Sequence, residues 1–208
     1  IFADSMPKGR VMFLTNFLKA VGCLLMLFGG HPLLAYAIVG IGAAAYSPAK
    51  YGILTELLPA EKLVIANGWI EGLTVGSIIL GVVLGGVLIK PEIASPILSL
   101  FHLNAIGLTS FAEAAIFAIT FVYVAASIVN LAIPDTGARY PKQKFDPIDS
   151  IRGFMTSCRL LWHDRLGQIS LSVTTLFWGA GAVLQFLVLK WCDHALGMTL
   201  SEGAVMQA

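Results

Sequence analysis

A lysine lies inside a stretch of the sequence that is otherwise apolar enough to cross a membrane. Residues 42–52 read GAAAYSPAKYG, and this stretch places Lys50 two residues after a proline. A charge at that depth costs at least ~2.5 kcal/mol, so it is normally retained where it pairs with another group or faces a polar cavity. Tyr46 and Ser47 precede Lys50 by four and three residues, on the same face of a helix. Lys50 is therefore a candidate functional-site residue.

Glu71 is the carboxylate that we expect to meet Lys50. Lys50 precedes the end of its apolar segment by seven residues, which places it ~10 Å deep at 1.5 Å per residue. Glu71 has about the same depth in the next segment, which runs the opposite way, so the two side chains can pair. Asn67 and Thr74 share the helical face of Glu71. Two interpretations stay open: a functional site that lines a polar cavity, and a structural pair that fixes helix register.

Two further polar or aromatic positions belong to the same candidate site. Trp178 is followed by Gly179 and lies near the middle of the last apolar segment, whereas tryptophan usually lies at the membrane interfaces. Gln185 follows seven residues later, near the same face. We expect these side chains to line a cavity, and the alternative is a large aromatic ring that fills a packing gap.

Other residues of the apolar segments have simpler interpretations. Glycines and one serine recur at roughly four-residue spacing over 68–85, a pattern that predicts close helix packing (Gly68, Gly72, Gly76, Ser77, Gly81 and Gly85). Glu56 is near enough to a segment end to be solvated. The long stem of Lys19 can extend toward the interface.

The composition is that of an integral membrane protein. Of the 208 residues 57% are hydrophobic and 12% are charged, whereas soluble domains have roughly 25% charged residues. The mean hydropathy is +0.84. The net charge of +1 gives no indication of a nucleic-acid partner. Three cysteines without CxxC or Cys/His spacing predict neither a disulfide nor a metal site, and we expect no cofactor.

Five segments are long and apolar enough to span a membrane, at about 20 residues for each span. They cover 11–30, 33–57, 63–89, 112–133 and 169–191. Nine Lys and Arg residues fall on one side of these spans, against Lys90 and Lys190 on the other, so the nine-residue side is cytoplasmic by the positive-inside rule. The nine are Lys8, Arg10, Lys62, Arg139, Lys142, Lys144, Arg152, Arg159 and Arg165.

The connectors contain two expected surface helices. Asp146 is a helix-capping residue, and apolar residues then repeat at helical spacing to Trp162. This pattern predicts an amphipathic helix, either on the cytoplasmic membrane surface or packed on the protein. Residues 97–107 predict a similar helix on the outer side. Because the chain starts with Ile1 and ends in a new apolar segment, we expect an excerpt of a longer protein.

Several motifs resemble a known family. Residues 3–12 (ADSMPKGRVM) are similar to the loop between the second and third helices of major facilitator superfamily transporters. Residues 42–54, Ala66-Asn67-Gly68, Glu71 and 176–181 (LFWGAG) resemble the bacterial lysophospholipid transporter family. The similarity covers roughly 3–87 and 145–198, although members of the family carry Arg at the position of Gln185 and a shorter loop at 90–111.

The resemblance implies part of an all-α, twelve-helix transporter rather than an enzyme. Residues 1–134 would be the rest of the N-terminal half, 135–168 the cytoplasmic central loop with its amphipathic helix, and 169–208 the start of the C-terminal half. Asp4, Lys8 and Arg10 would belong to a charged cluster that latches the two halves on the cytoplasmic side.

The implied activity is movement of lysophospholipids, chiefly lysophosphatidylethanolamine, from the outer to the inner leaflet of the bacterial inner membrane, where an acyltransferase restores the second chain. Membrane lipids and that acyltransferase are the implied partners. Two alternatives stay open: an exporter of small amphipathic drugs on the same fold, and the membrane half of an acyltransferase fusion.

Overall fold

The computed structural model describes residues 6–138 and 146–207, and every regular element in these ranges is helical. Five helices are long and apolar enough to cross a membrane: α1 (Lys8–Leu27), α2 (Pro32–Leu57), α3 (Ala60–Leu88), α5 (Phe111–Asn130) and α7 (Arg165–Leu196). The shorter elements are α4 (Pro91–Leu100), the 3₁₀ helix η2 (Leu103–Ile106), α6 (Pro147–His163) and α8 (Leu200–Gln207). This confirms the all-α membrane fold and the five predicted spans, whose ends shift by a few residues.

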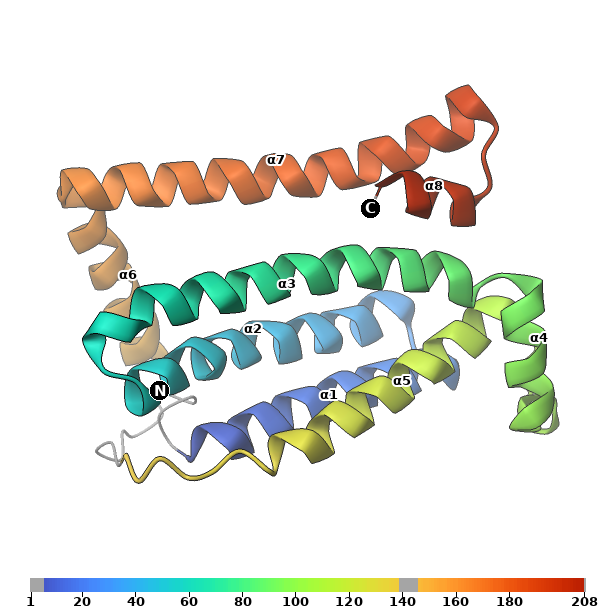
Figure 1. Cartoon of the computed structure of the whole chain (residues 1–208), viewed down its shortest axis with the longest axis horizontal. Helices are drawn as coiled ribbons and strands as arrows, with labels where there is room; N and C mark the ends of the chain where they lie inside the picture. The colour runs from blue at the N-terminus through green and yellow to red at the C-terminus, as the bar shows by residue number, and fades with distance from the viewer. Residues whose placement is uncertain (1–5, 139–145, 208) are drawn as a thin grey trace. The chain divides into compact units, whose positions relative to one another are not determined.

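The described chain divides into two compact units, residues 6–138 and 146–207. In the first unit, α1 packs between α2 and α5 (Figure 1). Glycines allow the close approach of α1 and α2. A Cβ atom at Gly42 would lie 2.8 Å from the carbonyl oxygen of Thr15, and one at Gly22 would lie 2.9 Å from the carbonyl oxygen of Ala35.

The third span has far fewer neighbours in this unit. A Cβ atom added at any of the five stripe glycines of α3 would meet no atom within 4 Å (Gly68, Gly72, Gly76, Gly81 and Gly85). The predicted packing of this stripe is therefore wrong within the described chain. The close contacts are made by isolated glycines of α1 and α2 instead, because α1 and not α3 occupies the middle of the helix group.

A proline interrupts the hydrogen bonding of α2 without ending the helix. Pro48 lies inside the 26-residue helix, and its ring nitrogen cannot donate to the carbonyl group of Ala44. The helix continues to Leu57. The loosened turn therefore lies directly before Lys50, as the sequence predicts.

The connection between α3 and α5 forms a small apolar cluster. Leu98 of α4 and Leu103 of η2 pack with Leu27 and Ala114. The outer helix predicted at 97–107 has different bounds: α4 begins at Pro91, because proline suits the first position of a helix, and a separate 3₁₀ turn follows.

The second unit contains α6, α7 and α8. Asp146 caps α6 by accepting hydrogen bonds from the amides of Ile148 and Asp149, at 2.9 and 3.3 Å. The amphipathic helix is thus present, with large apolar side chains such as Phe154 exposed. Its placement on the membrane surface stays a prediction, as does the division of the chain at 134 and 168.

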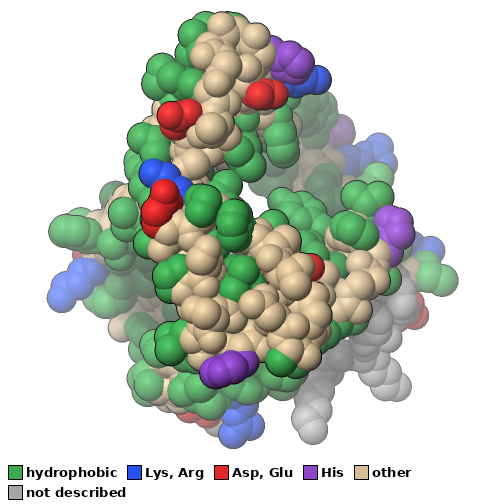
Figure 2. All heavy atoms as spheres, turned by 90° about the vertical axis from the view of Figure 1, so that its right-hand side faces the viewer, with side chains coloured by type: hydrophobic (Ala, Val, Ile, Leu, Met, Phe, Trp, Pro, Cys, Tyr) green, Lys and Arg blue, Asp and Glu red, His purple; other side chains and the backbone are tan. Residues whose placement is uncertain are grey.

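Large apolar side chains are exposed along the spans of both units. Figure 2 shows hydrophobic side chains over much of the face that it draws, with only scattered charged ones between them. A surface of this kind is stable next to lipid acyl chains, which do not penalise exposed apolar side chains.

Candidate functional site

Lys50 reaches from α2 to α3. Its Nζ atom donates a hydrogen bond to Thr74 Oγ1 at 3.0 Å and lies 4.6 Å from the centre of the Tyr51 ring. The Thr74 hydroxyl in turn donates to the carbonyl oxygen of Ile70 at 2.6 Å, which leaves its lone pairs to accept from Lys50. A lysine in a membrane span is thus held by a hydroxyl group and an aromatic face.

Glu71 accepts a hydrogen bond from the hydroxyl group of Tyr51, one residue after Lys50. The predicted direct ion pair between Lys50 and Glu71 is therefore wrong. The two helices run in opposite directions, and Lys50 meets the turn of Thr74, one turn beyond Glu71. Tyr51 reaches Glu71 in its place. Among the described residues neither charge has an ion-pair partner.

Tyr46 contacts a different helix. Its ring centre lies 4.7 Å from the Nζ atom of Lys19, which also lies 5.5 Å from the ring centre of Tyr123 and donates to Asn16 Oδ1 at 3.0 Å. Lys19 is thus held between α1, α2 and α5 by two aromatic faces and an amide. Sequence reasoning missed this group, because the partners of Lys19 on α2 and α5 are distant in sequence.

The structure does not bring the other predicted substrate-binding residues together. Ser47 and Asn67 are exposed on α2 and α3 and make no side-chain hydrogen bond within the described chain. Trp178 and Gln185 are exposed on α7 in the second unit, where the Trp178 ring meets Phe177 edge-on with 6.0 Å between ring centres. Their membership of one site stays a prediction.

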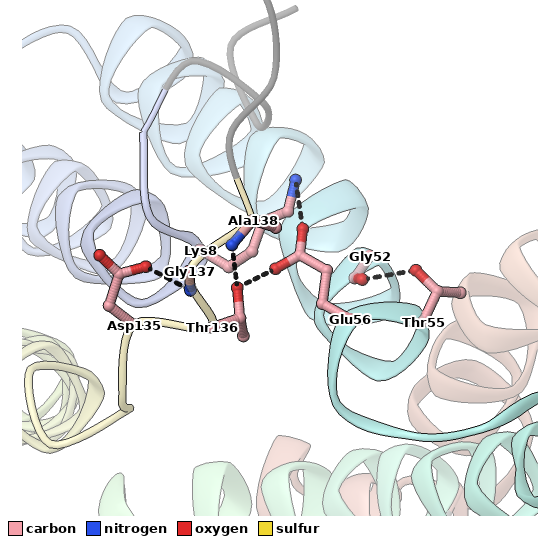
Figure 3. Close-up of polar contacts among 8 residues, drawn as sticks. All are labelled: Lys8, Gly52, Thr55, Glu56, Asp135, Thr136, Gly137 and Ala138. Carbon is pink, nitrogen blue, oxygen red and sulfur yellow. Dashed lines mark hydrogen bonds and ion pairs between the residues drawn. The ribbon is translucent and has the colours of Figure 1, made fainter.

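A second polar group lies at the ends of three elements of the first unit (Figure 3). Lys8 Nζ at the start of α1 lies 3.5 Å from Glu56 Oε1 near the end of α2, and these side chains are only 4% and 6% exposed. The hydroxyl group of Thr136, beyond α5, donates to Glu56 Oε2 at 2.6 Å. A Cβ atom at Gly52 would lie 3.4 Å from Lys8 Cε, so this glycine lets the lysine lie against α2.

The side chain of Glu56 is therefore buried, and the prediction that it is solvated is wrong. The reason is that Thr136 and Lys8 cover it, and they come from segments far away in sequence. Of the predicted latch residues, Lys8 is in this group and Arg10 is exposed nearby on α1. Asp4 lies outside the described residues.

No group of three or more His, Cys, Asp or Glu side chains within 6–138 and 146–207 is arranged to hold a metal ion. The chemistry that the described chain offers is reversible binding by hydroxyl, ammonium, carboxylate and aromatic groups, which suits recognition of a polar molecule.

Comparisons with known proteins give one consistent result. The chain is 43% identical over 199 residues to a protein of Yersinia enterocolitica named lysophospholipid transporter LplT, and this match covers 95% of the chain and 44% of that protein. Proteins with the same name from Cronobacter sakazakii and Pectobacterium carotovorum are 42% and 43% identical, again over 95% of the chain and 45% and 44% of their own lengths. No protein-family model and no solved structure matches the chain.

The chain thus spans somewhat less than half the length of the curated relatives that it matches. At 42–43% identity over nearly all of its residues, and with five helices that can span a membrane, it is a multi-pass bacterial membrane protein. The resemblance predicted from its motifs is confirmed: over 95% of its length the chain is similar to proteins named lysophospholipid transporters.

Proposed function

We propose that the protein containing this chain carries lysophospholipids across the bacterial inner membrane, from the outer to the inner leaflet, without covalent chemistry. The observation that carries this proposal is the similarity to lysophospholipid transporters over 95% of the chain. A functional link to an acyltransferase that adds the second acyl chain belongs to the same proposal, and so does the arrangement of the helices as part of a major facilitator superfamily bundle.

The polar residues between α2 and α3 support this function. A lysophosphatidylethanolamine headgroup has a phosphate and an ammonium. Here a lysine on α2 and a carboxylate on α3 both contact Tyr51, and neither has an ion-pair partner in the described chain. Lys50 would bind the phosphate and Glu71 the ammonium. Tyr51 lies between them, since its ring contacts Lys50 and its hydroxyl group donates to Glu71.

Lys50 and Glu71 each have a hydroxyl group as partner, which a substrate headgroup can replace. Lys50 donates to the Thr74 hydroxyl group and Glu71 accepts from the Tyr51 hydroxyl group, and both hydroxyl groups are neutral, whereas a headgroup supplies a full opposite charge. An opposite charge at hydrogen-bond distance adds a Coulomb attraction that a hydroxyl group lacks. The exchange of partners therefore favours binding of a zwitterionic headgroup.

Uptake of labelled lysophosphatidylethanolamine into spheroplasts tests the proposal. Lys50→Ala and Glu71→Gln should each lower uptake by ~10- to 150-fold, which corresponds to the loss of one hydrogen bond to a charged group. Lys62→Ala is the matched control, because Lys62 is an exposed lysine at the start of α3, and it should leave uptake unchanged.

The double variant separates the two interpretations of the charges. If both contact substrate, Lys50→Ala with Glu71→Ala stays inactive although the protein is made in normal amounts. Recovery of uptake in the double variant would instead show a structural pair. Full uptake by either single variant would remove that residue from the site.

A further inference from the structure

A cavity of about 440 Å³ lies between the end of α7 and the start of α8, within the second unit. Gly197 ends α7 in the left-handed conformation, with φ 61°, and the chain then turns so that α8 folds back against α7 (Figure 1). Cys192 is buried in this contact, and a Cβ atom at Gly203 would lie 3.4 Å from its Cβ atom. The volume is typical of small-molecule sites, which span ~300–1,000 Å³.

One face of α7 forms the longer wall of the cavity. Four of its residues line the cavity at the spacing of a single helical face, namely Phe186, Leu189, Lys190 and Asp193. The opposite wall is the turn into α8, residues 198–200. The wall of α7 is thus apolar at one end and carries a lysine and a carboxylate at the other.

The position of the cavity along α7 places its charged end at a membrane surface. Lys190 follows Arg165, the first residue of α7, by ~25 residues, or ~38 Å at 1.5 Å per residue. The hydrocarbon core of a bilayer is about 30 Å thick, so the two charges lie in opposite headgroup regions. Trp191 is 56% exposed at the level of Lys190, and tryptophan is enriched at membrane interfaces. Phe186, one turn before Lys190, lies ~6 Å closer to the hydrocarbon.

Both charges of the cavity are unpaired in the part of the chain that the structure describes. Lys190 and Asp193 are three residues apart, yet their side chains make no ion pair or hydrogen bond there. The ammonium of a lysine binds phosphate oxygens, and a carboxylate accepts hydrogen bonds from an ammonium. The cavity therefore combines an apolar surface, a cation and an anion, in this order along α7.

We propose that this cavity binds one lysophospholipid with an ethanolamine headgroup, with Lys190 at the phosphate, Asp193 at the ammonium and Phe186 along the acyl chain. The order of groups along α7 carries the proposal, because the lipid has its acyl chain, phosphate and ammonium in the matching order. The proposal deepens the proposed function and rests on it for the choice of a single-chain lipid. The charge pattern predicts that this end of α7 is the outer one, where the lipid would begin its passage.

Photo-crosslinking of the full-length protein in lipid nanodiscs tests the site. The probe is a lysophosphatidylethanolamine with a diazirine near the start of its acyl chain, and peptide mass spectrometry locates the new bond. We expect crosslinks within 186–200. Lys190→Gln and Asp193→Asn should each lower their yield at least about tenfold at low probe concentration, as expected for loss of a hydrogen bond to a charged group. His194→Gln is the matched control, because this exposed residue adjoins Asp193 but does not line the cavity.

Competing molecules identify the chemistry that the cavity recognises. Unlabelled lysophosphatidylethanolamine should displace the probe, whereas phosphoethanolamine and inorganic phosphate, which have no acyl chain, should not do so at the same concentration. Lysophosphatidylglycerol lacks the ammonium, so it should compete less well than lysophosphatidylethanolamine in the wild type and equally well in Asp193→Asn. Equal competition by phosphoethanolamine would overturn the lipid assignment, and equal competition by phosphatidylethanolamine would overturn the single-chain assignment.

Failure of this site is distinguishable from failure of the proposed transport site. Lys50→Ala with Glu71→Gln should keep the crosslinks within 186–200 although uptake is lost. Normal uptake by that variant would refute the transport site and leave the crosslinking result unaffected. Equal crosslink yields for wild type, Lys190→Gln and Asp193→Asn would overturn the cavity as a binding site, and so would crosslinks found only elsewhere in the protein.

Discussion

The buried group of Lys8, Glu56 and Thr136 allows a quantitative prediction about stability. Glu56→Leu leaves the Lys8 ammonium, 4% exposed, without the carboxylate 3.5 Å away. Removal of one partner from a buried ion pair destabilises a protein by about 3–5 kcal/mol, so the unfolding equilibrium constant should rise roughly 10²- to 10⁴-fold. Lys8→Met should have a similar effect, because it leaves the carboxylate buried instead.

The double variant gives the sharper test. Lys8→Met with Glu56→Leu removes both charges, and apolar replacement of both members of a buried ion pair is often close to neutral. It should therefore be more stable than either single variant. Thr136→Val removes one hydrogen bond to the carboxylate, at 2.6 Å, and should destabilise by about 1.5–3 kcal/mol.

Reversible unfolding by SDS in mixed micelles, followed by far-UV circular dichroism, measures these differences. Glu61→Gln and Lys62→Met are matched controls, because both side chains are exposed in the first turn of α3, and each should change the free energy of unfolding by less than about 0.5 kcal/mol. The reasoning fails if the single variants match these controls, or if the double variant is as unstable as the worse single variant.

Two further predictions concern orientation and packing. In a cysteine-free background, Ala60→Cys should react with a membrane-impermeant thiol reagent only after permeabilisation, and Ser95→Cys should react in intact spheroplasts; the opposite pattern would reverse the charge-based orientation. Gly42→Leu should sharply lower the yield of folded protein, because even a Cβ atom there would lie 2.8 Å from Lys19 Cγ and from a backbone oxygen. Gly40→Leu, at a position with no atom within 4 Å of an added Cβ, is its control, and equal yields would show that α1 and α2 do not pack closely in the membrane.

The sequence predicts the spans well because a bilayer imposes a simple requirement on them. Each span must be long and apolar regardless of its neighbours, so the five helices can be found without knowledge of tertiary contacts. Partners are harder to predict, since helical spacing defines a face but not the helix that this face meets. Lys50 and Glu71 are predicted to meet each other, yet an offset of one turn gives them Thr74 and Tyr51 as partners.

Residues far apart in sequence account for the other differences. Glu56 looks solvated when only its distance from a helix end is considered, but Thr136, 80 residues later, covers it. The glycine spacing of α3 resembles a packing face, although the described chain places no atom near it. In both cases the missing information is which elements meet, and periodicity alone does not contain it.

Pro48 divides α2 into two arms that both contact α1, and the second arm also contacts α3. On one side of the proline, Tyr46 contacts Lys19, whose helix is packed against α5. On the other side, Lys50 is bonded to Thr74 of α3. A helix bends most easily at a proline, since one backbone hydrogen bond is absent there. A bend at this turn would swing the second arm together with α3, but it would also separate Ile53 and Glu56 from Val11 and Lys8 of α1. The contacts with α1 therefore hold α2 against bending at its weakest turn.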